Sequence, residues 1–391
     1  MPWRARRRRL SNSLFVALLG YIAVVVLVDQ LVPRSTRLDV YAAAAPLVAA
    51  ALCSYRQAVV IAVVDFLVLS GLSGWVPDDP HAVNKITALV GDALLSGVAI
   101  VVARLLRDRD ALTERLIVTG EAAQRALLRQ LPLRSADVVV DGFYVSSQRD
   151  ALVGGDIYEV VETPYGTRVL VGDVQGKGLR TLGAGAAVLT AFREAAFHRR
   201  SLVSGVNAME QGLRRYNRST GENEDAAAER FVTALVFGVE QDHPGPRSAQ
   251  EVPLLLVDCG HVAPYLIRAD GTVRELEPES PGLPLGLGEL VERPRSVQRV
   301  AVPVGSRIFA CTDGVTEARD PDGTFYPLAD RLGGWASLPT PELLARLRAD
   351  LDAHTGGRLQ DDAAALIMER AAADGSGAGA GTGADADQVS G

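Results

Sequence analysis

The sequence predicts an α+β protein, with antiparallel sheets and helices packed on them, preceded by an all-α membrane region of about four helices. Three observations support this. The first hundred or so of the 391 residues are strongly hydrophobic, whereas the remainder has an ordinary soluble composition. Strand-like segments after residue 135 come mostly as neighbouring pairs, and the helix-like segments are grouped. Pairing of this kind favours antiparallel sheets over a doubly wound parallel sheet.

Hydrophobic runs at roughly 12–32, 38–54, 57–74 and 85–106 predict four membrane spans. A secretory signal is the competing interpretation of the first run, but no small-residue cleavage site follows it. Basic residues cluster at 4–9 and again directly after the last span. The positive-inside rule then places both termini in the cytoplasm of a multi-pass protein of the cell membrane.

Asp65 and Asp92 fall inside two predicted spans, where a charge is costly. One interpretation is a polar contact between helices, and the other is a sensing or ion site. A small transporter or channel with a regulatory tail is a third reading, but four short spans argue against it.

The domain organisation follows from these changes in composition. We expect a membrane region at 1–106, a helical linker at 107–134, one domain at 135–370, and a disordered Gly/Ala-rich tail at 371–391. Apolar residues recur at three-to-four spacing through the linker, which is a plausible homodimer seam or only a spacer.

Within 135–370 the patterns predict nine strands and three helices. The strands are expected at 137–146, 157–162, 167–172, 231–239, 252–258, 263–268, 297–302, 306–311 and 363–369, and the helices at 179–199, 201–217 and 340–354. Loops at 218–229 and 241–251 read as polar insertions.

Composition limits the function. The net charge of −7 argues against nucleic acid as a partner. The three cysteines stand far apart without ligand spacing, so neither a zinc site nor a disulfide framework is indicated. The Gly-rich stretch 172–178 lacks the spacing of a P-loop, and no serine-hydrolase elbow or zinc-peptidase helix occurs.

Two glycine-flanked aspartates organise the domain. Asp156 follows Gly154-Gly155, and Asp173 lies in the segment 172–178, with a predicted β-hairpin between them. A hairpin returns its ends to one place, so these two acids should meet at one rim. Two facing carboxylates repel unless they share a proton or bind a cation, although ordinary turn aspartates remain the alternative.

Two more acidic motifs lie downstream at strand ends. Asp313 follows the strand at 306–311, and Asp361-Asp362 opens the last strand. Such oxygen ligands suit magnesium or manganese, and four or five carboxylates would need about two divalent ions for neutrality. Paired metals are a standard means of activating water against a phosphate.

Seven motifs in order complete this pattern: GGD, GDVxGKG, FVTA, CGH, PLGL, TDGVTEAR and DD. This order resembles the SpoIIE-type branch of the metal-dependent, type 2C-like (PPM) serine/threonine protein phosphatases, over about 120–370. The resemblance implies a sandwich of two antiparallel sheets flanked by helices. It implies metal ligands at Asp156, Asp173, the carbonyl of Val174, Asp313 and Asp361, with Asp362 beside them, and supporting positions at Gly155, Glu159 and Gly314.

The implied reaction is hydrolysis of phosphoserine or phosphothreonine by a metal-bound hydroxide, with two Mn²⁺ or Mg²⁺ ions and with Asp156, Asp173, Asp313 and Asp361 as the catalytic acids. Lys177 would be a cation near the phosphate. The substrate class implied is a phosphorylated bacterial regulator, such as an anti-sigma-factor antagonist. The alternative is a membrane receptor whose phosphatase-like domain binds a partner without turnover.

Three positions depart from the family pattern. Glu159 stands where the family usually has aspartate, which alters the expected metal affinity. Phe325-Tyr326-Pro327 replaces the usual Phe-Gly, which puts the nearby loop in doubt. No histidine follows Asp173 as a proton donor; His261 is a candidate substitute, but we favour a structural turn histidine.

Overall fold

The structure is a computed structural model that describes residues 2–31, 41–72, 82–147, 154–176, 178–220, 230–239, 251–290 and 294–370. The chain divides into two compact units, Met1–Leu116 and Ile117–Gly391. Each unit is described by itself below. The predicted tail and most of the two predicted polar loops lie outside the described residues.

The first unit is helical. Its elements are α1 (Pro2–Leu31), α2 (Ala44–Leu52), α3 (Tyr55–Leu72) and α4 (Ala82–Leu127). Its core is rich in alanine, with Ile22 and Ile61 packed among Ala45, Ala49 and Ala99. Small side chains of this kind let helix backbones approach closely.

Four membrane spans were expected, and the described residues contain fewer. Among them, two helices are long and apolar enough to cross a membrane, at Leu10–Val28 and Leu89–Thr113, judged by length and composition only. Helix α2 has nine residues, about 14 Å of helix, which is less than half of a bilayer core. Helix α3 contains Arg56 and Asp65 within its 18 residues.

Helix α4 joins two segments that the sequence predicts separately. It runs without a break for 46 residues through the predicted span 85–106 and into the predicted linker. It ends at Leu127, shortly before Pro132, which cannot continue a helix.

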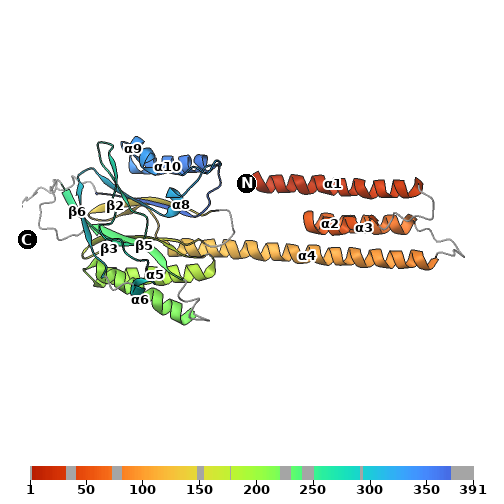
Figure 1. Cartoon of the computed structure of the whole chain (residues 1–391), viewed down its shortest axis with the longest axis horizontal. Helices are drawn as coiled ribbons and strands as arrows, with labels where there is room; N and C mark the ends of the chain where they lie inside the picture. The colour runs from red at the N-terminus through yellow and green to blue at the C-terminus, as the bar shows by residue number, and fades with distance from the viewer. Residues whose placement is uncertain are drawn as a thin grey trace, which may run out of the picture. The chain divides into compact units, whose positions relative to one another are not determined.

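The second unit contains two antiparallel sheets (Figure 1). The six-stranded sheet has the order β1-β2-β11-β10-β7-β8, and the five-stranded sheet has the order β3-β4-β5-β6-β9. The strands are β1 (Leu133–Arg134), β2 (Val138–Val145), β3 (Asp156–Thr163), β4 (Gly166–Val174), β5 (Val232–Val239), β6 (Glu251–Cys259), β7 (Tyr265–Ile267), β8 (Val273–Glu275), β9 (Gln298–Pro303), β10 (Arg307–Cys311) and β11 (Ala363–Arg370).

Helices cover the outer face of each sheet. Helices α5 (Leu179–His198) and α6 (Leu202–Thr220) pack on the five-stranded sheet. On the six-stranded sheet lie α8 (Asp313–Thr316), α9 (Leu328–Gly334) and α10 (Thr340–His354). Figure 1 shows these two groups on opposite sides of the sheets. A short 3₁₀ helix, η2 (Gly288–Leu290), lies in the segment before β9. The predicted layers are therefore confirmed.

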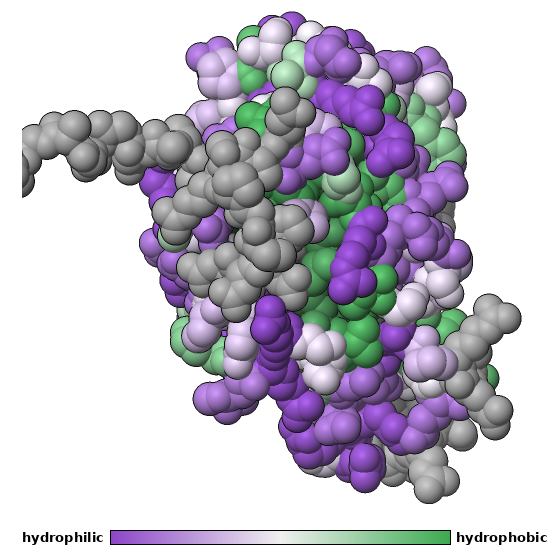
Figure 2. Space-filling view, turned by 90° about the vertical axis from the view of Figure 1, so that its left-hand side faces the viewer, coloured by the Kyte–Doolittle hydropathy of each residue, from purple (hydrophilic) through white to green (hydrophobic). Residues whose placement is uncertain are grey.

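The end of the sandwich where β5 finishes and β6 begins is partly open. Figure 2 shows hydrophobic side chains gathered at the centre of this face, among hydrophilic ones. Val239 and Val302, at this end, are half-buried against the core between the sheets. The hydrophobic surface here is therefore the edge of that core.

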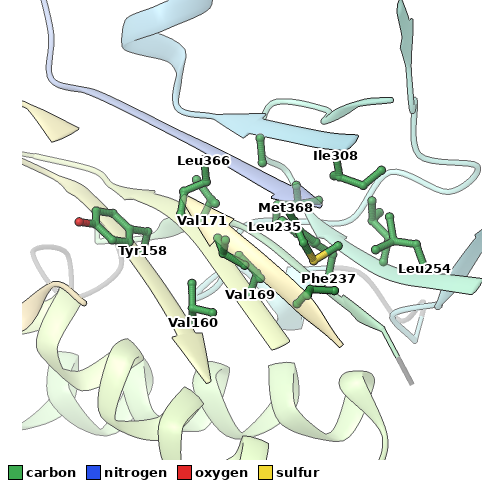
Figure 3. Packing of buried hydrophobic residues seen from close by; sticks show 14 of the residues in the cluster. Tyr158, Val160, Val169, Val171, Leu235, Phe237, Leu254, Ile308, Leu366 and Met368 are labelled. Atoms are coloured by element: carbon green, nitrogen blue, oxygen red, sulfur yellow. The ribbon is translucent and has the colours of Figure 1, made fainter. Parts of the chain in front are cut away.

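The core between the sheets comes from alternate residues of the facing strands (Figure 3). On β3 and β4, Tyr158, Val160, Val169 and Val171 point into it, whereas Ile157 and Leu170 point toward α5 and α6. This alternation is the two-residue period of a strand. It places Asp156 and Asp173 on the face between the sheets.

All nine predicted strands and all three predicted helices are present, with ends within three residues of those expected. The short elements β1, β8, α8, α9 and η2 were not predicted. They have two to seven residues each, too few to show a periodic pattern.

Candidate active site

The β3–β4 hairpin brings the first two acids together. Asp156 and Asp173 are direct partners in the antiparallel register, at the open end of the hairpin. The turn lies at the other end, between Thr163 and Gly166. The predicted meeting of these acids is therefore confirmed.

The facing sheet supplies three further acids at the same end. Strand β10 ends at Cys311 and β11 begins at Ala363, so Asp313 and Asp361-Asp362 adjoin paired strand ends. The backbone N–H of Thr312 donates to the carbonyl of Ala364 at 3.0 Å, which holds the two segments together. We call the five aspartates at positions 156, 173, 313, 361 and 362 the acidic rim.

Burial and mutual repulsion act on this rim. Burial, and then the charge of Asp173, raises the pKa of Asp156 well above its usual value. Burial, followed by the charges of Asp313 and Asp361, raises the pKa of Asp173 to about 7. The pKa of Asp313 is raised by burial and by Asp361. These carboxylates are therefore close enough to disfavour one another's ionised form.

The backbone of Gly155 packs closely against two oxygens. A Cβ atom at this position would lie 2.3 Å from Oδ1 of Asp173 and 2.5 Å from the carbonyl oxygen of Val174. At Gly314 a Cβ atom would lie 1.7 Å from the carbonyl oxygen of Asp362. Both glycines are required by close approach, and the first lets the chain pass beside a carboxylate and a carbonyl oxygen.

Thr312 connects the two sheets at the rim. Its hydroxyl donates to Oδ2 of Asp156 at 2.7 Å and accepts the N–H of Ala364 at 2.9 Å. The side chain of Asp156 is thus fixed from the opposite sheet.

Asp362 is held by donors from β2 and the residues after it. The hydroxyl of Tyr144 donates to Oδ2 at 2.5 Å, and the N–H of Ser147 donates to Oδ1 at 2.7 Å, with the Ser146 hydroxyl at 3.3 Å from Oδ1. Both carboxylate oxygens are therefore engaged by protein. Sequence reasoning missed Thr312 and Tyr144, although Thr312 lies within the TDG motif.

Glu159 lies on the other face of β3. Its carboxylate accepts a hydrogen bond from Nε of Arg193 on α5 at 2.5 Å, and Nη2 of the same arginine donates to the carbonyl of Leu127 at 2.6 Å. Alternation along the strand directs it away from Asp156 and into the layer of α5. The structure thus gives Glu159 a contact that joins β3, α5 and the end of α4, rather than one with the rim.

His261 bonds through Nδ1 to the hydroxyl of Thr233, at 3.0 Å, while Asp258 accepts its backbone N–H at 3.1 Å. Burial lowers the pKa of His261 to about 4, so the ring is neutral near pH 7. A neutral ring has no proton of the required acidity to give to a leaving group. These contacts agree with the structural role in a turn that the sequence analysis favoured for His261.

Lys177 and the segment 325–327 are the remaining positions singled out from the sequence. Lys177 lies outside the described residues. Tyr326 is buried and donates to Asp350 at 2.8 Å, while Phe325 packs against the guanidinium of Arg319. The loop with the departing Phe325-Tyr326-Pro327 sequence is thus anchored at both residues.

The rim suits small, hard cations by its donor chemistry. All its donors are oxygens, and a carboxylate oxygen of Asp173 and the carbonyl oxygen of Val174 lie together against the backbone of Gly155. In the described part of the chain, no three His, Cys, Asp or Glu side chains stand close enough to enclose one ion. Ions of the magnesium class fit this arrangement, because they keep several waters and need only one or two carboxylates each.

A family model for stage II sporulation protein E (SpoIIE) matches residues 163–371, more than half of the chain. The chain belongs to the SpoIIE family. SpoIIE proteins are PP2C-type (PPM) serine/threonine phosphatases, so the second unit is a phosphatase domain of this class. No curated protein matches the chain significantly in sequence.

One solved structure with a TM-score above 0.5 supports the fold, and two others are similar to part of the chain. The SiaA-PP2C domain of Pseudomonas aeruginosa matches 67% of this chain and 98% of its own length, with 20% identity and a TM-score of 0.51. The RsbU and RsbW domains of a Mycobacterium tuberculosis protein match over 60% of each chain, with 23% identity and a TM-score of 0.48. The PP2C domain and regulatory fragment of Bacillus subtilis SpoIIE match 60% of this chain and 65% of their own length, with 14% identity and a TM-score of 0.45.

Proposed function

We propose that the acidic rim binds two divalent cations, Mn²⁺ or Mg²⁺, and hydrolyses phosphoserine or phosphothreonine on a bacterial regulatory protein. One observation carries the proposal. Strand ends from two sheets gather five aspartates at one place, where the backbone of Gly155 packs closely against two of the oxygens.

We assign each residue of the rim a role from the contacts it makes. Asp156, Asp173, Asp313, Asp361 and the carbonyl oxygen of Val174 would hold the cations. Asp362 is the exception to the expected ligand set, because Tyr144 and Ser147 already occupy both of its oxygens. We assign it the role of fixing the chain near Gly154, whose Cβ position would lie 1.2 Å from Oδ2 of Asp362.

The cations would supply a water of lowered pKa and neutralise charge on the phosphoryl oxygens. The protein's own contribution is to position the carboxylates that would hold the cations. Thr312 holds the carboxylate of Asp156 in one orientation, and the β3–β4 register keeps Asp173 opposite it. Since His261 is neutral, we propose that solvent protonates the leaving group.

The substrate and the location are proposed from the family. A SpoIIE phosphatase acting on a phosphorylated anti-sigma-factor antagonist would work in the cytoplasm. Two apolar helices in the first unit fit anchoring in the cell membrane, with both termini on the cytoplasmic side. We retain residues 135–370 as the domain and the linker at residues 107–134 as the proposed dimer seam.

The test is phosphate release from a phosphoserine peptide by the full chain, with manganese present or removed by chelator. Asp173→Asn and Asp313→Asn should each lower kcat by at least about a hundredfold, the loss that follows removal of a major electrostatic contact. The matched control is Asp330→Asn, an exposed acid on α9. Turnover that is independent of metal, or equal in all three variants, would refute the proposal.

A further inference from the structure

Two buried carboxyl groups of the first unit lie within reach of each other, and no donor from another residue pairs with them. Asp65 on α3 is 0% exposed and Asp92 on α4 is 4% exposed. Neither oxygen of either side chain has a hydrogen-bond partner. The two carboxyl groups are within hydrogen-bonding reach of each other, so a shared proton or a cation between them would relieve their repulsion.

A third buried oxygen lies beside them. Ser96 follows Asp92 by four residues on α4, which puts the two side chains on one face of the helix. Ser96 is 6% exposed, and its hydroxyl also has no partner. The Ser96 hydroxyl carries no charge, so charge repulsion between the two acids does not explain why it lacks a hydrogen-bond partner.

Among the described residues of this unit, the buried side-chain oxygens without a partner are those of Asp65, Asp92 and Ser96. Gln57 on α3 accepts from the hydroxyls of Ser11 and Ser54, at 2.7 and 2.8 Å, and donates to Asn12 at 2.9 Å. The unpartnered oxygens are thus concentrated around Asp65 and Asp92. A buried polar group without a partner is costly, and a buried charge without one is more so.

We propose that Asp65, Asp92 and Ser96 form a binding site for a divalent hard cation of the Mg²⁺ and Ca²⁺ class. Carboxylate and hydroxyl oxygens are the ligands these ions prefer. Two carboxylates carry two negative charges, which one divalent ion balances. The site belongs to the first unit and is separate from the acidic rim. Cation binding there would be a second function of the chain, in addition to phosphate hydrolysis.

The experiment uses the full chain in lipid nanodiscs, with Asp173→Asn and Asp313→Asn introduced to weaken cation binding at the rim. MgCl₂ and CaCl₂ are titrated separately by calorimetry. Asp65→Asn should weaken the remaining cation binding at least about tenfold, or remove it. The control is Asp108→Asn, an exposed acid on α4 paired with Arg104, which should leave the binding unchanged. Equal binding by these two variants would overturn the proposal.

A second variant and a second readout guard against a folding defect. Ser96→Ala removes one neutral hydroxyl and should weaken binding about threefold, with an unchanged far-ultraviolet spectrum. Added cation should raise the unfolding midpoint of the parent but not of Asp65→Asn. If neither salt moves the parent's midpoint and acidification alone does, the pair binds only protons and the proposal is wrong.

Discussion

At the scale of single residues, the absence of a side chain at Gly155 determines how closely the chain can approach the oxygens of the rim. Its Cβ position would lie within 2.5 Å of both a carboxylate and a carbonyl oxygen. Gly155→Ala should therefore lower manganese affinity at least about tenfold, because its Cβ atom would displace two of the proposed ligand oxygens. Calorimetric titration with manganese measures this. Gly205→Ala on α6, where nothing lies within 4 Å, is the control and should bind as the parent does.

Thr312 makes a second prediction at this scale. Thr312→Val keeps the shape but leaves Oδ2 of Asp156 and the N–H of Ala364 without their partner. We expect a loss of about 1–3 kcal/mol in the free energy of unfolding, since a buried group left unsatisfied costs this much. Urea unfolding measures it. Thr312→Ser retains the hydroxyl and should lose clearly less; an equal loss in both variants would contradict the assigned hydrogen bonds.

The sequence reveals acids at the rim more readily than the groups that hold them. Asp156 and Asp173 could be paired because a hairpin with a recognisable turn separates them. Tyr144 could not be paired with Asp362, because 218 residues separate them and a strand tyrosine is ordinary in a sheet. Its role depends on β2 lying beside β11, which no local pattern encodes.

At the scale of elements, Arg193 ties α5 to its surroundings. It pairs with the buried carboxylate of Glu159 on β3 and donates to the carbonyl of Leu127 at the end of α4. Arg193→Met should destabilise the domain by about 1–3 kcal/mol, because it leaves Glu159 buried with no cation. Chemical unfolding tests this, and Glu159→Gln in the same background should restore part of the loss. An additive double variant would show that the pair is not coupled.

The elements also show where sequence patterns fail. The predicted spans and linker were placed from hydropathy, which registers apolar content and not helix continuity. Helix α4 therefore appeared as two segments, and the alanine-rich α2 appeared long enough to span. Strands of eight or nine residues were located correctly because their alternation persists over several periods.

At the scale of the whole molecule, repulsion among the carboxylates of the rim destabilises the folded domain when no cation is bound. The pKa of Asp173 is raised from its usual value near 4 to about 7, so the folded domain prefers the protonated acid. The stability this group contributes is complete below pH 4 or so and is lost as the pH rises through about 7. In chelator, the unfolding midpoint should therefore rise as the pH is lowered from about 8 to about 6. Asp173→Asn should flatten this part of the profile; an unchanged slope would assign it to other groups.

The layered architecture was predictable because paired strands and grouped helices admit few arrangements. The strand order was not. Strands β2 and β11 lie together although one opens the domain and the other closes it. This pairing brings Asp361 and Asp362 to the rim, and it follows from long-range packing of the two sheets. Only the ordered set of seven motifs indicated it beforehand.

The most direct test of the central claim is a count of manganese ions bound per chain at equilibrium, by electron paramagnetic resonance of free manganese. The full chain is compared with Asp173→Asn, in an Asp65→Asn background that removes the other proposed cation site. The account predicts two ions at the rim for the parent, and loss of at least one in Asp173→Asn. A count of zero, or the same count in both proteins, would contradict it.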